Sequence, residues 1–169
     1  MKVLWVLRHA KAQAGSPSGG DHDRALTSRG ERQVTEVGVG GMAAGVAAGV
    51  ALPGLVLSSS ATRALETARG VLPWTGDADL VAERDLYLAD PDDLVERLRL
   101  IDDEYPSVML VGHNPTVSDL VHLLGSGPGG RPEAGELPTG GLAVLELDIA
   151  SWARLGSGTG RVVCSFAPG

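Results

Sequence analysis

Six short apolar runs recur along the chain, and the segments between them carry apolar residues at a helical spacing. Runs of this length that are rich in Val and Leu are typical of buried strands. The predicted strands are residues 2–7, 55–57, 80–81, 108–111, 142–147 and 162–166. Residues 14–23 are rich in Gly, Ser, Pro and Asp, which predicts a loop between the first strand and the first helix.

The first predicted helix opens at Ser28. Glu31 follows three residues later, in the pattern of a capping box. Apolar residues then keep a roughly helical spacing at Val34, Val37, Met42, Val46 and Val50. Glycines 38, 40 and 41 lie inside this segment, and each is expected to weaken a helix by about 1 kcal/mol relative to Ala.

Three further helices are predicted after later strands. Ser60 can cap a helix that carries Leu65, Ala68 and Leu72 on one face. The pairs Asp90-Pro91 and Asn114-Pro115 each place a capping side chain directly before proline, a signal for a helix start. The residues expected to face inward from these two helices are Leu94, Leu98, Ile101, Val117, Leu120, Val121 and Leu124. We expect the last helix to stop at Gly125, and residues 125–130 and 156–160 to form Gly-rich loops.

The alternation of strands and helices favours an α/β fold, a three-layer α/β/α sandwich with a mostly parallel central sheet. At 169 residues the chain is expected to be a single domain, 1–169. Residues 37–62 carry no charge, but their many Gly and Ala residues give little membrane-transfer free energy. We interpret them as a small-residue helix, a turn and a buried strand, and predict no membrane association.

Charge and cysteine content narrow the function classes. The net charge is −7 and no basic run is present, which argues against non-specific nucleic-acid binding. Cys164 is the single cysteine, so no disulfide can form within the chain. No signal peptide is visible, because the opening residues run straight into a predicted core strand. These features predict a cytoplasmic protein.

Four charged residues share one structural context, the carboxyl end of a predicted strand. Arg8 and His9 follow the first strand, Arg63 lies in the first turn after the second, and His113 follows the strand at 108–111. Ligands of open α/β sheets bind in the crevice at these strand ends. We therefore expect the four side chains to converge on one site.

Such a cluster suits phosphoryl transfer. Arginine forks match phosphate oxygens in bidentate geometry, and a neutral histidine nitrogen can attack phosphorus to form a covalent intermediate. A second histidine can offset charge in the transition state, and a carboxylic acid can protonate the leaving group. Asp85 and Glu83 both follow the third strand, and the residues leave open which of them plays that part.

Four segments, in order over about the first 120 residues, carry a resemblance to a known family. They are Leu7-Arg8-His9-Ala10, Arg24-Ala25-Leu26-Thr27 with Gly30 and Gln33, the segment from Ser58 to Ala68 that contains Arg63-Ala64, and Val111-Gly112-His113-Asn114-Pro115. The chain resembles the histidine phosphatase superfamily, also called the phosphoglycerate-mutase-like family. It looks most like its SixA-type phosphohistidine phosphatase branch. Position 10 is Ala, where the family signature has Gly.

The resemblance implies a phosphoglycerate-mutase-like fold and a phosphatase that works without cofactor or metal. It implies His9 as phosphoryl acceptor, with Arg8, Arg63 and His113 around the phosphate and Arg24 near the substrate. Asp85 falls at the family's acid position, and Glu83 remains the alternative. The expected substrate is phosphohistidine on a signalling protein. The alternatives are a small-molecule phosphomonoesterase and a catalytically silent phospho-ligand module.

Overall fold

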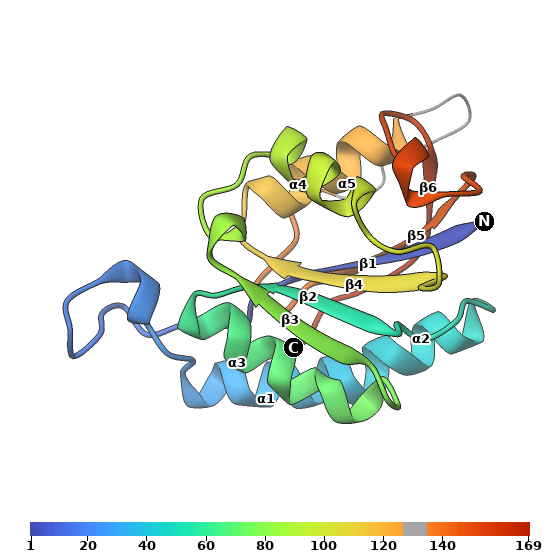
Figure 1. The fold of residues 1–169 in the computed structure, drawn as a ribbon. Coiled ribbons are helices and arrows are strands. Elements are labelled where there is room, and N and C mark those ends of the chain that lie inside the picture. Colours follow the sequence, from blue (N-terminus) through green and yellow to red (C-terminus); the bar gives the residue numbers. More distant parts are fainter. Residues whose placement is uncertain (127–134) are drawn as a thin grey trace.

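The structure is a computed structural model, and it describes residues 1–126 and 135–169. Within these residues the chain forms one six-stranded sheet between two layers of helices (Figure 1). The strands are β1 Lys2–Arg8, β2 Leu55–Ser59, β3 Asp79–Glu83, β4 Ser107–Gly112, β5 Leu142–Leu147 and β6 Gly160–Phe166. The predicted strand at 142–147 agrees to the residue, and the others are longer than predicted.

The strand order is β3-β2-β4-β1-β5-β6. The first four strands in this order pair in parallel, and β5 and β6 add two antiparallel pairings at the far side. The prediction of a mostly parallel sheet inside an α/β sandwich is confirmed. Strand β1 lies between β4 and β5, so the residue that follows it reaches the middle of the sheet edge.

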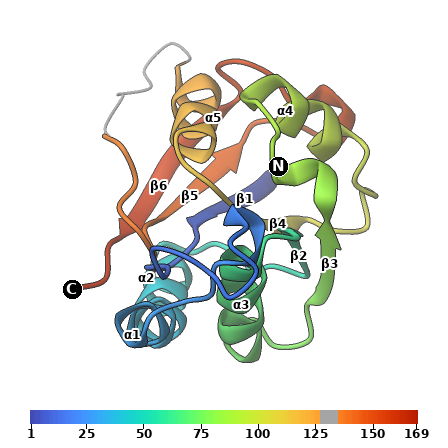
Figure 2. The same ribbon diagram turned by 90° about the vertical axis from the view of Figure 1, so that its left-hand side faces the viewer.

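The helices are α1 Ser28–Glu36, α2 Met42–Ala47, α3 Thr62–Val71, α4 Pro91–Arg99 and α5 Thr116–Gly125. Figure 2 shows α1, α2 and α3 on one face of the sheet and α4 and α5 on the other. Each face has its own buried cluster: Leu98 and Leu120 belong to the α4–α5 side, and Val34 and Ala68 belong to the α1–α3 side. All seven residues predicted to face inward from α4 and α5 are buried.

Three predicted helix caps were each wrong by one residue. The first helix is capped by Thr27, not Ser28, because Thr27 Oγ1 accepts from the Gly30 N–H at 3.0 Å. The cap of α3 is Ala61 rather than Ser60, whose hydroxyl bonds instead to His22. Helix α5 begins at Thr116 after Pro115, and the Asn114 amide donates to the Leu137 carbonyl. The side chains of Ser60 and Asn114 bond elsewhere, which sequence spacing does not reveal.

The predicted buried face of α3 was right at Ala68 and wrong at Leu65 and Leu72. Leu65 and Leu72 are only partly buried, whereas Ala64, Ala68 and Val71 are fully buried. The buried stripe also contains Arg63 and Thr67, two polar residues that an apolar pattern leaves out. The helix is therefore rotated so that Arg63 faces the interior.

The uncharged segment 37–62 forms a helix, a turn and strand β2, as predicted. Its helical part contains a π-helical stretch, Val37–Gly41, before α2. A Cβ atom built on Gly45 would lie 2.0 Å from the Trp5 ring, and one on Gly38 would lie 2.3 Å from the Trp74 ring. The glycines thus let this segment approach two large aromatic rings closely.

Short helical turns complete the described residues. They are η1 Asp21–Asp23, η3 Leu72–Trp74, η4 Arg84–Leu86 and η5 Trp152–Arg154. None of the helices in residues 1–126 and 135–169 is both long and apolar enough to cross a membrane. The predicted Gly-rich loop at 125–130 falls largely outside the described residues, whereas Gly160 of the second predicted loop already belongs to β6.

Candidate active site

His9 follows β1 directly and is held by main-chain bonds on both sides. Its N–H donates to the Gly112 carbonyl of β4 at 3.0 Å, and its carbonyl accepts from the Gly140 N–H at 3.1 Å. The ring is buried, and Nδ1 lies 2.7 Å from the Ala10 carbonyl oxygen. A carbonyl oxygen can only accept, so Nδ1 carries the proton and Nε2 keeps a free electron pair.

Burial lowers the pKa of His9 to about 4, since the charged imidazolium would lose its hydration. The bond to Ala10 opposes this shift, and the positive charges of Arg63, Arg8 and Arg24 add to it. The ring is therefore neutral at pH 7. A neutral imidazole with a free Nε2 is the form that attacks phosphorus.

Arg63 lies in the first turn of α3 with its guanidinium against His9. Its Nε donates to His9 Nε2 across 3.4 Å. Thr67, one turn later, donates to the Arg63 carbonyl at 2.7 Å and accepts from the Ala10 N–H at 3.0 Å. The start of α3 is thereby tied to the loop that carries the nucleophile candidate.

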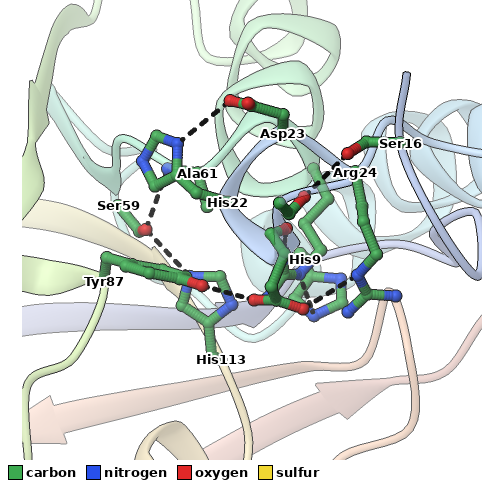
Figure 3. Close-up of polar contacts among 12 residues, drawn as sticks. His9, Ser16, His22, Asp23, Arg24, Ser59, Ala61, Tyr87 and His113 are labelled. Carbon is green, nitrogen blue, oxygen red and sulfur yellow. Dashed lines mark hydrogen bonds and ion pairs between the residues drawn. The ribbon is translucent and has the colours of Figure 1, made fainter. Parts of the chain in front are cut away.

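His113 follows β4, and its ring lies beside that of His9, as Figure 3 shows. Its ring centroid lies 5.2 Å from that of His9, and its Nε2 lies 2.8 Å from the Ser59 hydroxyl at the end of β2. Among the described residues Nδ1 of His113 has no hydrogen-bond partner, although it is buried. Burial, with the nearby His9 and Arg63, lowers the pKa of His113 to about 3, so this ring is neutral too.

Arg8 and Arg24 lie at different depths. Arg8 donates from Nη1 to the Leu137 carbonyl at 2.9 Å, and its buried Nε has no partner within residues 1–126 and 135–169. Burial lowers the pKa of Arg8, with the charge of Glu136 opposing that effect. Arg24 lies in the loop before α1 and donates to the Gln13 carbonyl at 2.8 Å.

Asp21 and Tyr87 also belong to this cluster, although they were not predicted from the sequence. Asp21 accepts from Arg63 Nη2 at 3.0 Å and from Arg24 Nε at 2.9 Å, and the Tyr87 hydroxyl donates to the same carboxylate. The Tyr87 ring packs edge-on against His113, with centroids 5.6 Å apart. Asp21 precedes Arg24 by three residues, a spacing that could have indicated an ion pair between them. Tyr87 gave none, because it follows an edge strand in a turn.

Neither acid candidate hydrogen-bonds through its side chain to a described residue of this cluster. Glu83 ends β3 and forms a bidentate ion pair with Arg97 of α4, at 2.7 to 3.0 Å. Asp85 is exposed and lines a groove of about 630 Å³ together with Tyr87 and Leu88. No hydrogen bond described in the structure joins either carboxylate to His9. The assignment of an acid to Asp85 stays a prediction.

The described residues contain no group of three or more His, Cys, Asp or Glu side chains arranged to hold a metal ion. His22, which has an acidic residue on each side in the sequence, bonds through Nε2 to the Ser60 hydroxyl at 2.9 Å. Its ring also packs against Tyr87 at 4.9 Å. His22 therefore supports the wall of the site.

Comparison with curated proteins gives full-length relatives. The chain is 35% identical to an uncharacterized protein of Mycobacterium tuberculosis over 170 residues, which is 96% of this chain and 99% of the relative. No family model matches the sequence.

Solved structures share the fold over nearly the whole chain. A protein assigned as the phosphohistidine phosphatase SixA of Nakamurella multipartitia has a TM-score of 0.77, with 25% identity over 99% of this chain and 96% of its own. The protein with the same assignment from Agrobacterium tumefaciens has a TM-score of 0.75, with 28% identity over 99% and 98%. A mycobacterial glucosyl-3-phosphoglycerate phosphatase shares the fold alone, with 18% identity over 99% and 100% and a TM-score of 0.66.

Proposed function

The chain belongs to the histidine phosphatase superfamily and is a phosphatase of that type, and we propose that it hydrolyses phosphohistidine on a protein. The reaction runs through a phosphoryl group carried on His9. The observation that carries the choice of substrate is the state of the described carboxyl groups: Glu83 pairs with Arg97, Asp85 is exposed, and the Asp21 carboxylate is bound by arginines. Membership of the family indicates that the reaction takes place at a phosphoryl group, and the charges of this site favour one kind of leaving group.

The first half of the reaction uses the free electron pair of His9 Nε2. This atom attacks phosphorus, the bond from phosphorus to the leaving atom breaks, and its electrons go to the leaving group. Arg8 and Arg63 bind the phosphoryl oxygens with fixed donors, which stabilises the charge that spreads over them. Nδ1 of His113, which has no partner in the described part of the chain, donates a further hydrogen bond. Water then attacks the phosphoryl group on His9 and releases phosphate.

An ester substrate depends on a general acid, and neither acid candidate makes a side-chain hydrogen bond to this site in the described residues. An ester oxygen departs as an alkoxide unless it is protonated, and general acid catalysis typically contributes about 10²–10⁴-fold. Glu83 is engaged by Arg97, and Asp85 is exposed to solvent. The ring of phosphohistidine can take its proton from solution, because imidazole titrates near pH 6.5. It then departs as neutral imidazole without a protein acid.

A protein-borne substrate suits the surface beside the site. The groove on the outer side of Tyr87 holds about 630 Å³. Leu88 and Leu100 line it and are 84% and 79% exposed. Exposed leucines that line one groove next to a reactive centre favour contact with another protein surface. The same proposal assigns Arg24 to substrate contact and the protein to the cytoplasm.

The deciding experiment is a substrate panel with purified protein and EDTA. It compares a phosphohistidine-bearing protein, free phosphohistidine and a set of phosphorylated metabolites, with His9→Ala as the control. We expect the phosphoprotein to give the highest kcat/KM and EDTA to leave the rate unchanged. A metabolite preferred by tenfold or more would assign a small-molecule phosphatase instead. No turnover of any compound would assign a phospho-ligand binding module.

A further inference from the structure

The Asp21 carboxylate lies at the exposed rim of the positively charged site, where its side chain is 54% exposed and contacts two arginines. One oxygen, Oδ2, accepts from Arg63 Nη2 at 3.0 Å and from the Tyr87 hydroxyl, and Oδ1 accepts from Arg24 Nε at 2.9 Å. The Asp21 main-chain carbonyl accepts from Arg63 Nη1 at 2.8 Å. Both terminal nitrogens of Arg63 are thus bound to one aspartate.

The same guanidinium connects Asp21 to the nucleophile. Arg63 donates from Nε to His9 Nε2 and from Nη2 to Asp21 Oδ2. A phosphoryl group transferred to His9 therefore lies within about one guanidinium width of the carboxylate. The bonds from Tyr87, Arg63 and Arg24 hold the pKa of Asp21 well below its usual range, so the carboxylate is ionised at neutral pH.

A fixed negative charge at this position distinguishes between phosphorylated substrates. It repels a dianionic phosphomonoester, because like charges a few ångströms apart raise the energy of the complex. It attracts a substrate whose leaving group is a cation, and it raises the pKa of that cation. An N-phosphorylated imidazole with its second ring nitrogen protonated is such a substrate.

We propose that Asp21 is a specificity-determining residue that favours phosphoryl groups on a cationic nitrogen heterocycle over phosphate esters. This inference rests on the proposed function of the site. The step balances without a protein acid: His9 Nε2 forms a bond to phosphorus, and the phosphorus–nitrogen bond breaks. The electron pair returns to the ring nitrogen, and the ring departs as neutral imidazole with the proton it already carried.

Two small substrates test the role of Asp21, because neither can bind through a protein surface outside the site. N-phosphorylimidazole has a leaving ring that can be cationic, and 4-nitrophenyl phosphate is dianionic with a leaving group that needs no acid. Asp21→Asn keeps the shape and removes the charge. We expect kcat/KM to fall at least about fivefold for N-phosphorylimidazole and to stay level or rise for 4-nitrophenyl phosphate, the scale of one partly exposed charge contact.

Asp23→Asn is the matched control, because Asp23 lies in the same turn and bonds to Ser18 and His22 rather than to an arginine. It should leave both values unchanged. A second measurement needs no turnover: calorimetric binding of inorganic phosphate should tighten at least about threefold in Asp21→Asn.

The outcomes separate this inference from the proposed function. If Asp21→Asn changes kcat/KM for both substrates by the same factor and weakens phosphate binding, Asp21 only positions the arginines. The inference then fails, and the proposed phosphatase function is unaffected. If the wild-type protein turns over neither these two substrates nor a phosphohistidine-bearing protein, the proposed function fails. Unchanged phosphate binding in Asp21→Asn would by itself overturn the role of the Asp21 charge.

Discussion

Ser59 and His113 come from neighbouring parallel strands and meet at the strand ends, with 2.8 Å between the Ser59 hydroxyl and Nε2 of His113. The hydroxyl also accepts from the Ala61 N–H at 3.2 Å, so its position is fixed from a second side. This contact occupies one nitrogen of His113 and leaves Nδ1 for a ligand. The orientation of His113 is therefore set by a buried serine.

Replacing Ser59 with Ala should release that ring. We expect kcat/KM to fall by about tenfold, the effect of losing one hydrogen bond in a buried polar site. The 15N chemical shifts of the His113 ring should change at the same time. An unaltered rate with altered shifts would mean that the orientation of His113 does not matter for turnover.

Replacing His9 with Ala should abolish turnover, because the Nε2 electron pair that attacks phosphorus is lost with the ring. We expect a loss of at least about 10⁴-fold in kcat, the scale seen when a nucleophile is removed. Circular dichroism should show an unchanged fold. Labelled substrate trapped briefly without acid should mark His9, and label on Cys164 or a serine would contradict the mechanism.

Glu83→Gln and Asp85→Asn address the missing acid. We expect each to lower kcat/KM on phosphohistidine protein by less than about tenfold, below the usual contribution of a general acid. Glu83→Gln should instead reduce the free energy of unfolding by about 1 kcal/mol, because the half-buried pair with Arg97 is weakened. Denaturant unfolding and steady-state kinetics separate the two effects. A loss of 10² or more in either variant would identify the acid.

Stability should depend on pH through His9, which is buried, and His113, which is partly buried. The pKa values of His9 and His113 are lowered to about 4 and about 3 in the folded protein, against about 6.5 in the unfolded chain. Below pH 6.5 the unfolded chain binds more protons, so stability is full above this pH and falls toward pH 4. Denaturant unfolding of the wild type and of His9→Gln tests this. The free energy of unfolding should fall less steeply with decreasing pH in the variant than in the wild type. Equal slopes would contradict the prediction.

Gly45→Ala should destabilise the protein although Ala favours helices. The added Cβ would meet the fully buried Trp5 ring at 2.0 Å, and overpacking of this kind costs about 1–3 kcal/mol. Gly15→Ala is the control, since a Cβ there meets no atom within 4 Å. A Gly45→Ala protein with unchanged or raised thermal stability would show that the helix can move away from Trp5.

The sequence by itself determined the layers and the approximate positions of the strands. Apolar runs and helical spacing are local patterns. They predicted the bounds of strand β5 to the residue and the buried faces of α4 and α5. Arg8, His9, Arg63 and His113 stand beside those runs. Parallel strands bring their carboxyl ends to one edge, so a grouping of these residues could be predicted from position alone.

Tertiary structure decided which side chains complete the site. Asp21 reaches Arg63 across 42 positions and Tyr87 reaches Asp21 across 66, contacts that no local pattern encodes. The rotation of α3 that buries Arg63 and Thr67 depends on hydrogen bonds rather than on hydrophobic spacing. Asp85 and Glu83 looked equivalent in sequence, and only the fold paired Glu83 with Arg97 and left Asp85 in solvent. A side chain's environment is set by neighbours distant in the chain, which is why the charge state of this site appears only once the chain is folded.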